Sequence, residues 1–112
     1  MTEPRPIYDS KVENNEVDIE VDVENGKTVL FYSGSYCNPC KQIIPYFKVL
    51  KSIYPQLKFY KLDVNKNRDS SEMFNITVLP TFVLIKDGIV IKKITGARKE
   101  VLNSSISELN KL

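Results

Sequence analysis

The pattern of hydrophobic and polar positions predicts strands that alternate with helices. Residues 28–34, TVLFYSG, are apolar on both faces through Phe31, which is typical of a central strand covered on both sides. The next segment has helical spacing, and its apolar positions are Ile43, Ile44, Phe47, Leu50, Ile53 and Tyr54. Pro45 lies inside this segment, and we expect it to kink the helix because it lacks an N–H.

The second half of the chain continues the alternation. We expect a strand at 57–64, a short helix at 65–75, a hairpin of strands at 81–85 and 89–94, and an amphipathic helix after Gly96. This order predicts an α/β sandwich, with a mixed sheet and helices on both faces. The first two strands should be parallel, because a helix crosses over between them.

The N-terminal segment gives conflicting signals. Residues 16–23, EVDIEVDV, alternate strictly, which is typical of a strand. A hairpin with 28–34 would place them beside the central strand, which already needs partners on both sides. The four intervening residues are also too few for a parallel crossover. We therefore expect a helix, with a strand outside the main sheet as the alternative.

Charge divides the chain into two parts. Residues 1–26 hold eight acidic and two basic side chains, a net charge of −6, whereas the remainder holds 14 basic and six acidic ones. We expect a solvated acidic arm at 1–26, including any first helix, and a mildly basic domain at 27–112. A basic partner for the arm, or acidic partners for the domain, is the alternative. The basic residues are scattered, so nucleic-acid binding is not indicated.

Length and composition indicate one domain of a globular protein. The 112 residues suffice for a single core, and no apolar run approaches the roughly 20 residues of a membrane helix. The N-terminus lacks the apolar region of a secretory signal. Both cysteines fall in one motif, which suits a reducing compartment, so we expect a cytoplasmic location unless a longer native chain carries a targeting segment.

Cys37 and Cys40 lie where the buried strand ends and the helix begins. Unpaired N–H groups and the positive end of the helix dipole converge there and favour a thiolate on Cys37. Residues three apart share one side of a helical turn, so the pair can close a small disulfide, and Pro39 suits the first turn. The more exposed Cys37 would attack a substrate disulfide, and Cys40 would then attack Cys37 and release the product.

Three alternatives to a redox pair stay open. Zinc needs four ligands, and the chain has no further Cys and no His, so only a homodimer could complete a site; we expect no metal. A purely structural disulfide would close a loop too short to constrain the unfolded chain much. Two inert cysteines are the third alternative, against which the strand–helix junction argues.

Together these residues resemble the thioredoxin family. YCNPCKQIIPYF is similar to the family's active-site helix, W-C-G-P-C-K-x-x-x-P-x-x, and FYKLDV resembles the strand with a partly buried lysine, here Lys61. NITVLPTFVLIKDG resembles the stretch with the cis-proline loop and hairpin, and Gly96 matches a glycine before the last helix. The resemblance covers about 28–112.

The resemblance implies a three-layer α/β/α sandwich with a sheet of order 1-3-2-4-5. It implies a cis bond before Pro80, where the residues alone favour an ordinary trans proline. It also implies a substrate groove that is lined by Tyr36, Leu79, Pro80, Thr81 and Gly96. In this groove the substrate chain would pair with the backbone beside the cis-proline.

The resemblance further implies an activity and its partners. A monomeric thioredoxin-like oxidoreductase would reduce protein disulfides through the redox-active Cys37–Cys40 pair. It would hold no bound cofactor and would draw electrons from NADPH indirectly, through a thioredoxin reductase.

The chain departs from the family pattern around the cysteines. Phe31 stands six residues before Cys37, where the family usually carries a buried Asp that helps proton transfer at the second cysteine. Cys40 must then lose its proton by another route, such as water near Lys61, and we expect slower resolution of the mixed disulfide.

Three more positions differ. Tyr36 and Ser33 stand where the family carries tryptophans, so partner recognition should differ, although Tyr36 keeps an aromatic lid. Asn38 replaces a Gly between the cysteines, and we expect an altered redox potential because residues there stabilise one oxidation state.

Several functions therefore compete. The leading hypothesis is an intracellular dithiol–disulfide reductase. A glutaredoxin-like, glutathione-dependent reductase is one alternative, although the Pro-Tyr typical of that pattern is missing between the cysteines. A secretory oxidase or isomerase would need an export signal. A thioredoxin-like binding or redox-sensing module with little turnover is the alternative from another class.

Overall fold

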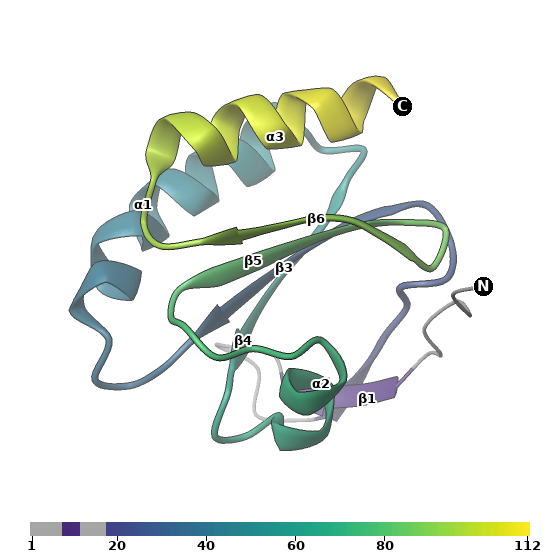
Figure 1. Ribbon diagram of the computed structural model, residues 1–112. Helices are drawn as coiled ribbons and strands as arrows, with labels where there is room; N and C mark the ends of the chain where they lie inside the picture. The colour runs from purple at the N-terminus through teal and green to yellow at the C-terminus, as the bar shows by residue number, and fades with distance from the viewer. Residues whose placement is uncertain (1–7, 12–17) are drawn as a thin grey trace.

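Four strands form the main sheet of the protein. The computed structural model describes residues 8–11 and 18–112, with side chains from residue 21 onward. The strand order is β4-β3-β5-β6 (Figure 1). β3 is parallel to β4, whereas β5 is antiparallel to both β3 and β6. The strands span Lys27–Ser33 (β3), Lys58–Asp63 (β4), Thr81–Lys86 (β5) and Ile89–Thr95 (β6).

Helices cover both faces of this sheet, which confirms the predicted α/β sandwich. α1 (Asn38–Ile53) and α3 (Lys99–Lys111) lie over one face, and the short α2 (Arg68–Met73) lies over the other (Figure 1). β3 is apolar on both faces because each face is buried. Phe31 belongs to the cluster beneath α1 and α3, and Tyr32 belongs to the cluster on the α2 face.

The expected N-terminal helix is wrong where the structure describes this segment. Residues 18–21 form a strand, β2 (Asp18–Val21), antiparallel to β1 (Tyr8–Lys11) in a separate two-stranded sheet. The alternative, a strand outside the main sheet, is therefore confirmed for residues 18–21, and its pairing partner precedes it in the chain. Residues 16 and 17 lie outside the described residues.

The expected sheet order holds for four of its five positions. β4-β3-β5-β6 corresponds to the 3-2-4-5 part of the order 1-3-2-4-5. Among residues 8–11 and 18–112, no fifth strand joins this sheet next to β4, because β1 and β2 pair with each other. Val21 and Val23 are nevertheless fully buried in the cluster on the α2 face, so the end of the acidic segment contributes to the core.

Lys58 ties the segment after β2 to the main sheet. Its ammonium group donates to the backbone oxygens of Asp22 and Asn25 at 2.7 and 2.6 Å, and lies 3.7 Å from the Asp22 carboxylate. The pKa of Asp22 is lowered, first by a hydrogen bond from the Asn25 side chain and further by Lys58, although partial desolvation opposes the shift. Burial, with Asp22 nearby, raises the pKa of Tyr60 on the same strand.

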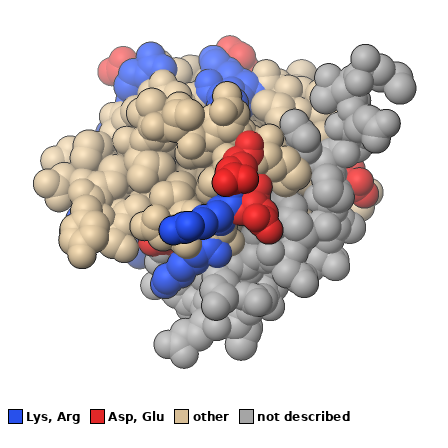
Figure 2. All heavy atoms as spheres, turned by 60° about the horizontal axis from the view of Figure 1, so that its bottom comes forward, with Lys and Arg blue, Asp and Glu red and all other residues tan. Residues whose placement is uncertain are grey.

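Charged side chains occur in small, separate groups on one face of the molecule. Figure 2 shows Lys and Arg beside Asp and Glu, with uncharged surface between the groups. The part of this face that the structure describes therefore carries no continuous basic surface of the kind that follows a nucleic-acid backbone.

The packing of α3 on the sheet generates a stability prediction. Ile106 is completely buried in the α1/α3 cluster, whereas Ile91 on β6 is 47% exposed. Ile106→Ala should lower the free energy of unfolding by about 2–5 kcal/mol, because it removes buried methylenes and leaves a cavity. The matched Ile91→Ala should change it by only about 0.5 kcal/mol. Denaturant titration measures both values, and equal losses would contradict this account of the core.

Candidate active site

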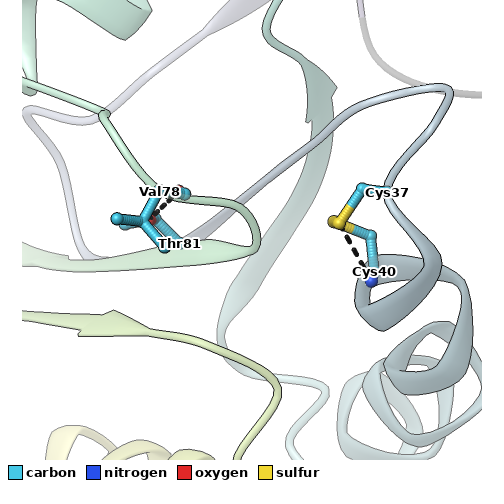
Figure 3. The surroundings of a disulfide bond; sticks show 4 residues. All are labelled: Cys37, Cys40, Val78 and Thr81. Carbon is cyan, nitrogen blue, oxygen red and sulfur yellow. Dashed lines mark hydrogen bonds between the residues drawn. A yellow bond between two sulfur atoms is a disulfide. The ribbon is translucent and has the colours of Figure 1, made fainter.

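The cysteine pair occupies the junction between β3 and α1, as predicted. Cys37 is the N-cap of α1, and its sulfur accepts a hydrogen bond from the Cys40 backbone N–H at 3.1 Å. The two residues form a disulfide, with their Cα atoms 5.2 Å apart (Figure 3). Cys37 is half-buried, whereas Cys40 is only 1% exposed. The two sulfurs therefore differ in access from solvent, as two sequential roles require.

The start of α1 favours negative charge on Cys37. Pro39 lies in the first turn, where its missing N–H costs nothing, and the first turn carries no acidic residue. The exposed N–H groups and the helix dipole therefore act on a Cys37 thiolate without a competing carboxylate. Asn38 and Pro39 are both exposed, so their side chains are accessible to a partner.

The loop before β5 lies opposite the disulfide and contains the predicted cis-proline. The Leu79–Pro80 peptide bond is cis, and Thr81 donates its hydroxyl to the Val78 carbonyl (Figure 3). Gly96, with φ +88°, donates its backbone N–H to the Pro80 carbonyl at 2.8 Å. The structure thus brings together the predicted groove residues Leu79, Pro80, Thr81 and Gly96.

Gly34 allows this loop to approach β3 closely. A Cβ atom at position 34 would lie 3.0 Å from Cδ1 of Leu79, tighter than nine in ten Cβ contacts in proteins. Leu79 and Cys37 both pack against the α1/α3 cluster. The missing side chain at position 34 therefore leaves room for Leu79 between β3 and the cis-proline loop.

Tyr36 does not pack on the body of the protein. Its side chain is 97% exposed, although it directly precedes the nucleophilic position. Val78, beside the cis-proline, is also 48% exposed, and it was not among the predicted groove residues. Apolar side chains this exposed near a reactive group are typical of a surface that a partner covers.

An open polar pocket of about 180 Å³ lies beside Cys40. Its lining combines neutral, cationic and anionic groups: Ser33, Gly34, Ser35, Cys40, Lys41, Ile44, Lys61 and Asp63. Lys61 was predicted to lie near the resolving cysteine, and the structure places both on this pocket.

Sequence reasoning missed Asp63, which the sequence could have revealed. Asp63 pairs in register with Ser33 at the end of two parallel strands. Because the carboxyl ends of parallel strands meet at one edge of a sheet, a polar residue ending β4 lies near the motif that follows β3. The fold therefore brings a carboxyl group to the cysteines.

Comparisons with known proteins agree with this geometry. The sequence model of the thioredoxin family matches residues 9–108. The chain belongs to the thioredoxin family. It is similar to thioredoxin H2 of Arabidopsis thaliana, with 38% identity over 80% of this chain and 68% of that protein. Thioredoxins are thiol–disulfide oxidoreductases, and this chain carries the disulfide-forming pair of that class.

Solved structures show the same fold. The oxidised mitochondrial thioredoxin 3 of Saccharomyces cerevisiae matches with a TM-score of 0.74 and 37% identity, over 77% of this chain and 81% of that chain. A poplar thioredoxin h matches with a TM-score of 0.72 and 35% identity, over 76% of this chain and 77% of that chain. A thioredoxin named as mitochondrial and a thioredoxin of the h type thus both share the fold of this chain.

The described residues support neither a metal site nor a membrane-spanning helix. Within this part of the chain, no three His, Cys, Asp or Glu side chains gather into a possible metal site. Nor is any helix found there long and apolar enough to cross a membrane.

The largest departure from the usual thioredoxin site is Phe31. Its ring is fully buried, stacked on Phe82 with ring centroids 4.7 Å apart and edge-to-face with Phe47 at 4.9 Å. Cys40 and Phe31 belong to the same apolar cluster. The residue at the usual position of the buried carboxylate thus contributes packing and offers Cys40 no proton acceptor.

Restoring a carboxylate tests this interpretation of Phe31. Phe31→Asp should speed the attack of Cys40 on the mixed disulfide, because a carboxylate beside the thiol can accept its proton. Rapid-mixing single-turnover reduction of a model disulfide measures this step. Phe31→Leu, which keeps the site apolar, should leave the rate unchanged.

Folding must be checked beside this rate. Phe31→Asp should also lower the free energy of unfolding by more than about 3 kcal/mol, because it removes a buried ring and buries a carboxyl group. Lys61, the register partner of residue 31 on β4, offsets part of this loss. An unchanged rate in a folded Phe31→Asp protein would contradict the proton-transfer role assigned to this position.

Proposed function

We propose that this chain reduces protein disulfides, with Cys37 as the nucleophile and Cys40 as the resolving thiol. The observation that carries the assignment is the difference in burial within one helix turn. Cys37 is half-buried at the N-cap of α1, whereas Cys40 is 1% exposed behind it. A substrate can reach the first sulfur, whereas the buried second sulfur lies within reach of the mixed disulfide at Cys37.

The proposed reaction takes two exchanges. The Cys37 thiolate attacks one sulfur of the substrate disulfide, forms a mixed disulfide and releases the other substrate sulfur as a thiolate. Cys40 loses its proton and attacks Cys37, and the second substrate sulfur leaves as a thiolate. The substrate gains two electrons, and the Cys37–Cys40 disulfide forms, which is the state that the structure shows.

The groove beside the cis-proline would hold the substrate chain. Leu79 is half-buried and Val78 is exposed beside it, so this loop offers an apolar rim next to Cys37. The backbone of Leu79, beside the cis-proline, would pair with an extended substrate segment as an added strand, while Tyr36 and Gly96 flank it. Substrate selection would then depend on backbone shape and on the exposed Tyr36 ring.

Recycling of the disulfide requires an external reductant. We place the protein in a reducing compartment such as the cytoplasm, where a thioredoxin reductase would pass electrons from NADPH to Cys37–Cys40. Cys37 and Cys40 are the only cysteines of the chain, so it can form no additional structural disulfide. The lack of structural disulfides suits a reducing compartment. We propose that the protein acts as a monomer, because one chain supplies both thiols.

A second candidate function is a redox-sensing or binding module with little turnover. Phe31 favours it, because the usual carboxylate beneath the resolving cysteine is replaced by an aromatic ring. Such a module would form the Cys37–Cys40 disulfide but would exchange it slowly with substrates.

Turnover distinguishes the two candidates. The wild-type protein should catalyse the reduction of insulin disulfides by dithiothreitol, measured as the onset of turbidity. Cys37→Ser should abolish this catalysis, because it removes the attacking sulfur. Wild-type protein no faster than dithiothreitol alone would favour the sensing module.

Trapping tests the order of the two cysteines. Cys40→Ser should retain substrates as mixed disulfides on Cys37, because the resolving attack cannot occur. Gel electrophoresis without reductant should show these adducts with oxidised insulin, and dithiothreitol should remove them. Cys37→Ser should yield far fewer, since Cys40 is buried. More adducts on Cys37→Ser than on Cys40→Ser would reverse the assignment.

A further inference from the structure

The resolving step needs a proton acceptor that the apolar side of the site does not provide. Given the two-thiol mechanism proposed above, on which this inference rests, Cys40 must become a thiolate before it attacks Cys37. On one side, Cys40 packs in the cluster that contains Phe31 and Phe47. These rings can neither accept a proton nor hold water.

On its other side, Cys40 lines the polar pocket. Among the described residues, Asp63 supplies the one carboxylate of the lining. It ends β4 and is only 5% exposed, so its position is fixed by the sheet and not by a mobile surface chain. Because Ser33, its register partner, is small, a cavity remains between the end of the sheet and α1.

The two oxygens of Asp63 have different surroundings. Oδ1 accepts a short hydrogen bond of 2.8 Å from the Asn65 backbone N–H, which anchors the carboxylate. Oδ2 accepts from the Ser35 hydroxyl at 3.5 Å, the limit of a hydrogen bond. Ser35 itself lines the pocket. The weakly bonded oxygen therefore lies next to a pocket residue, and it can accept another hydrogen bond.

Cations border the same space. Lys41, on the first turn of α1, and Lys61, on β4, both line the pocket, and Ser33, Gly34 and Ser35 add no charge. These two lysines and Asp63 are the charged groups of the described lining. Positive charge on both elements favours the Cys40 thiolate once it forms.

We propose that Asp63 accepts the proton of Cys40 through water in this pocket. The S–H bond of Cys40 breaks, its proton passes through water to Oδ2 of Asp63, and the electron pair stays on sulfur. That sulfur attacks Cys37, the bond between Cys37 and the substrate breaks, and the substrate sulfur leaves with the electron pair. Asp63 then returns its proton to water, and the leaving thiolate takes one from solvent.

The isosteric substitution Asp63→Asn tests the proposal. Asparagine keeps an acceptor for the Asn65 N–H but cannot take up a proton at neutral pH. The mixed disulfide with a model substrate should persist about tenfold longer or more at pH 7, by quenched rapid mixing. The first attack by Cys37 should keep its rate, because its thiolate is stabilised at the helix start.

The pH profile separates a proton acceptor from a structural residue. At alkaline pH hydroxide can remove the Cys40 proton without help from a carboxylate, so the rates of wild type and Asp63→Asn should converge as the pH rises. A residue that only supports the fold would slow resolution equally at every pH. Asp63→Glu, which restores a carboxylate, should recover part of the lost rate.

A matched control and a second variant keep the test decisive. Asp69→Asn, on α2, removes the same charge away from the pocket lining and should leave resolution unchanged. Ser33→Val should reduce the water in the pocket while leaving Asp63 in place, and should also slow resolution. This variant decides the matter if Asp63→Asn does not fold.

The outcomes distinguish this inference from the proposed function. An active wild type whose mixed disulfide has the same lifetime and pH profile in folded Asp63→Asn would overturn the role of Asp63 alone. A constant slowing at all pH values would also overturn it. A wild type without insulin turnover would instead overturn the reductase function, and this inference with it.

Discussion

The parallel pairing of β3 with β4 is the constraint on which the site depends. Parallel strands in register end at the same edge, so Ser33 and Asp63 finish side by side, one before the cysteine motif and one before α2. A chain that leaves β3 at this edge must enter α1 directly above the end of β4. The disulfide, the pocket and the polar end of β4 are therefore neighbours because of sheet topology.

Much of this arrangement could be predicted from local patterns. β3 is buried on both faces, and its unbroken apolar run indicated this. The turn residues between β5 and β6 predicted their hairpin, and the helical spacing of apolar residues predicted α1. These features depend on short segments. The pocket escaped prediction because it depends on the absence of a large side chain at Ser33 and on Asp63, 30 residues away in sequence.

The N-terminal segment shows where topological reasoning fails. The alternation of 16–23 was sound evidence for a strand, and we expected a helix because the strand that follows in the chain could not be its partner. β2 instead pairs with β1, which precedes it. Pairing partners are a property of the whole chain, whereas alternation is local.

Phe31 is a related case. Its position in an apolar strand predicted that it is buried, but only its contacts with Phe47 and Phe82 show that it belongs to an aromatic cluster.

Gly34 determines how closely the Leu79 side chain approaches the end of β3. Because Leu79 lies against the space that a side chain at position 34 would occupy, even a methyl group there would require the end of the Leu79 side chain to shift. The surface that Leu79 presents beside the disulfide thus depends on the absence of a side chain at position 34. Stepwise enlargement of residue 34 would be a direct way to retune which protein segments the site admits, with both cysteines unaltered.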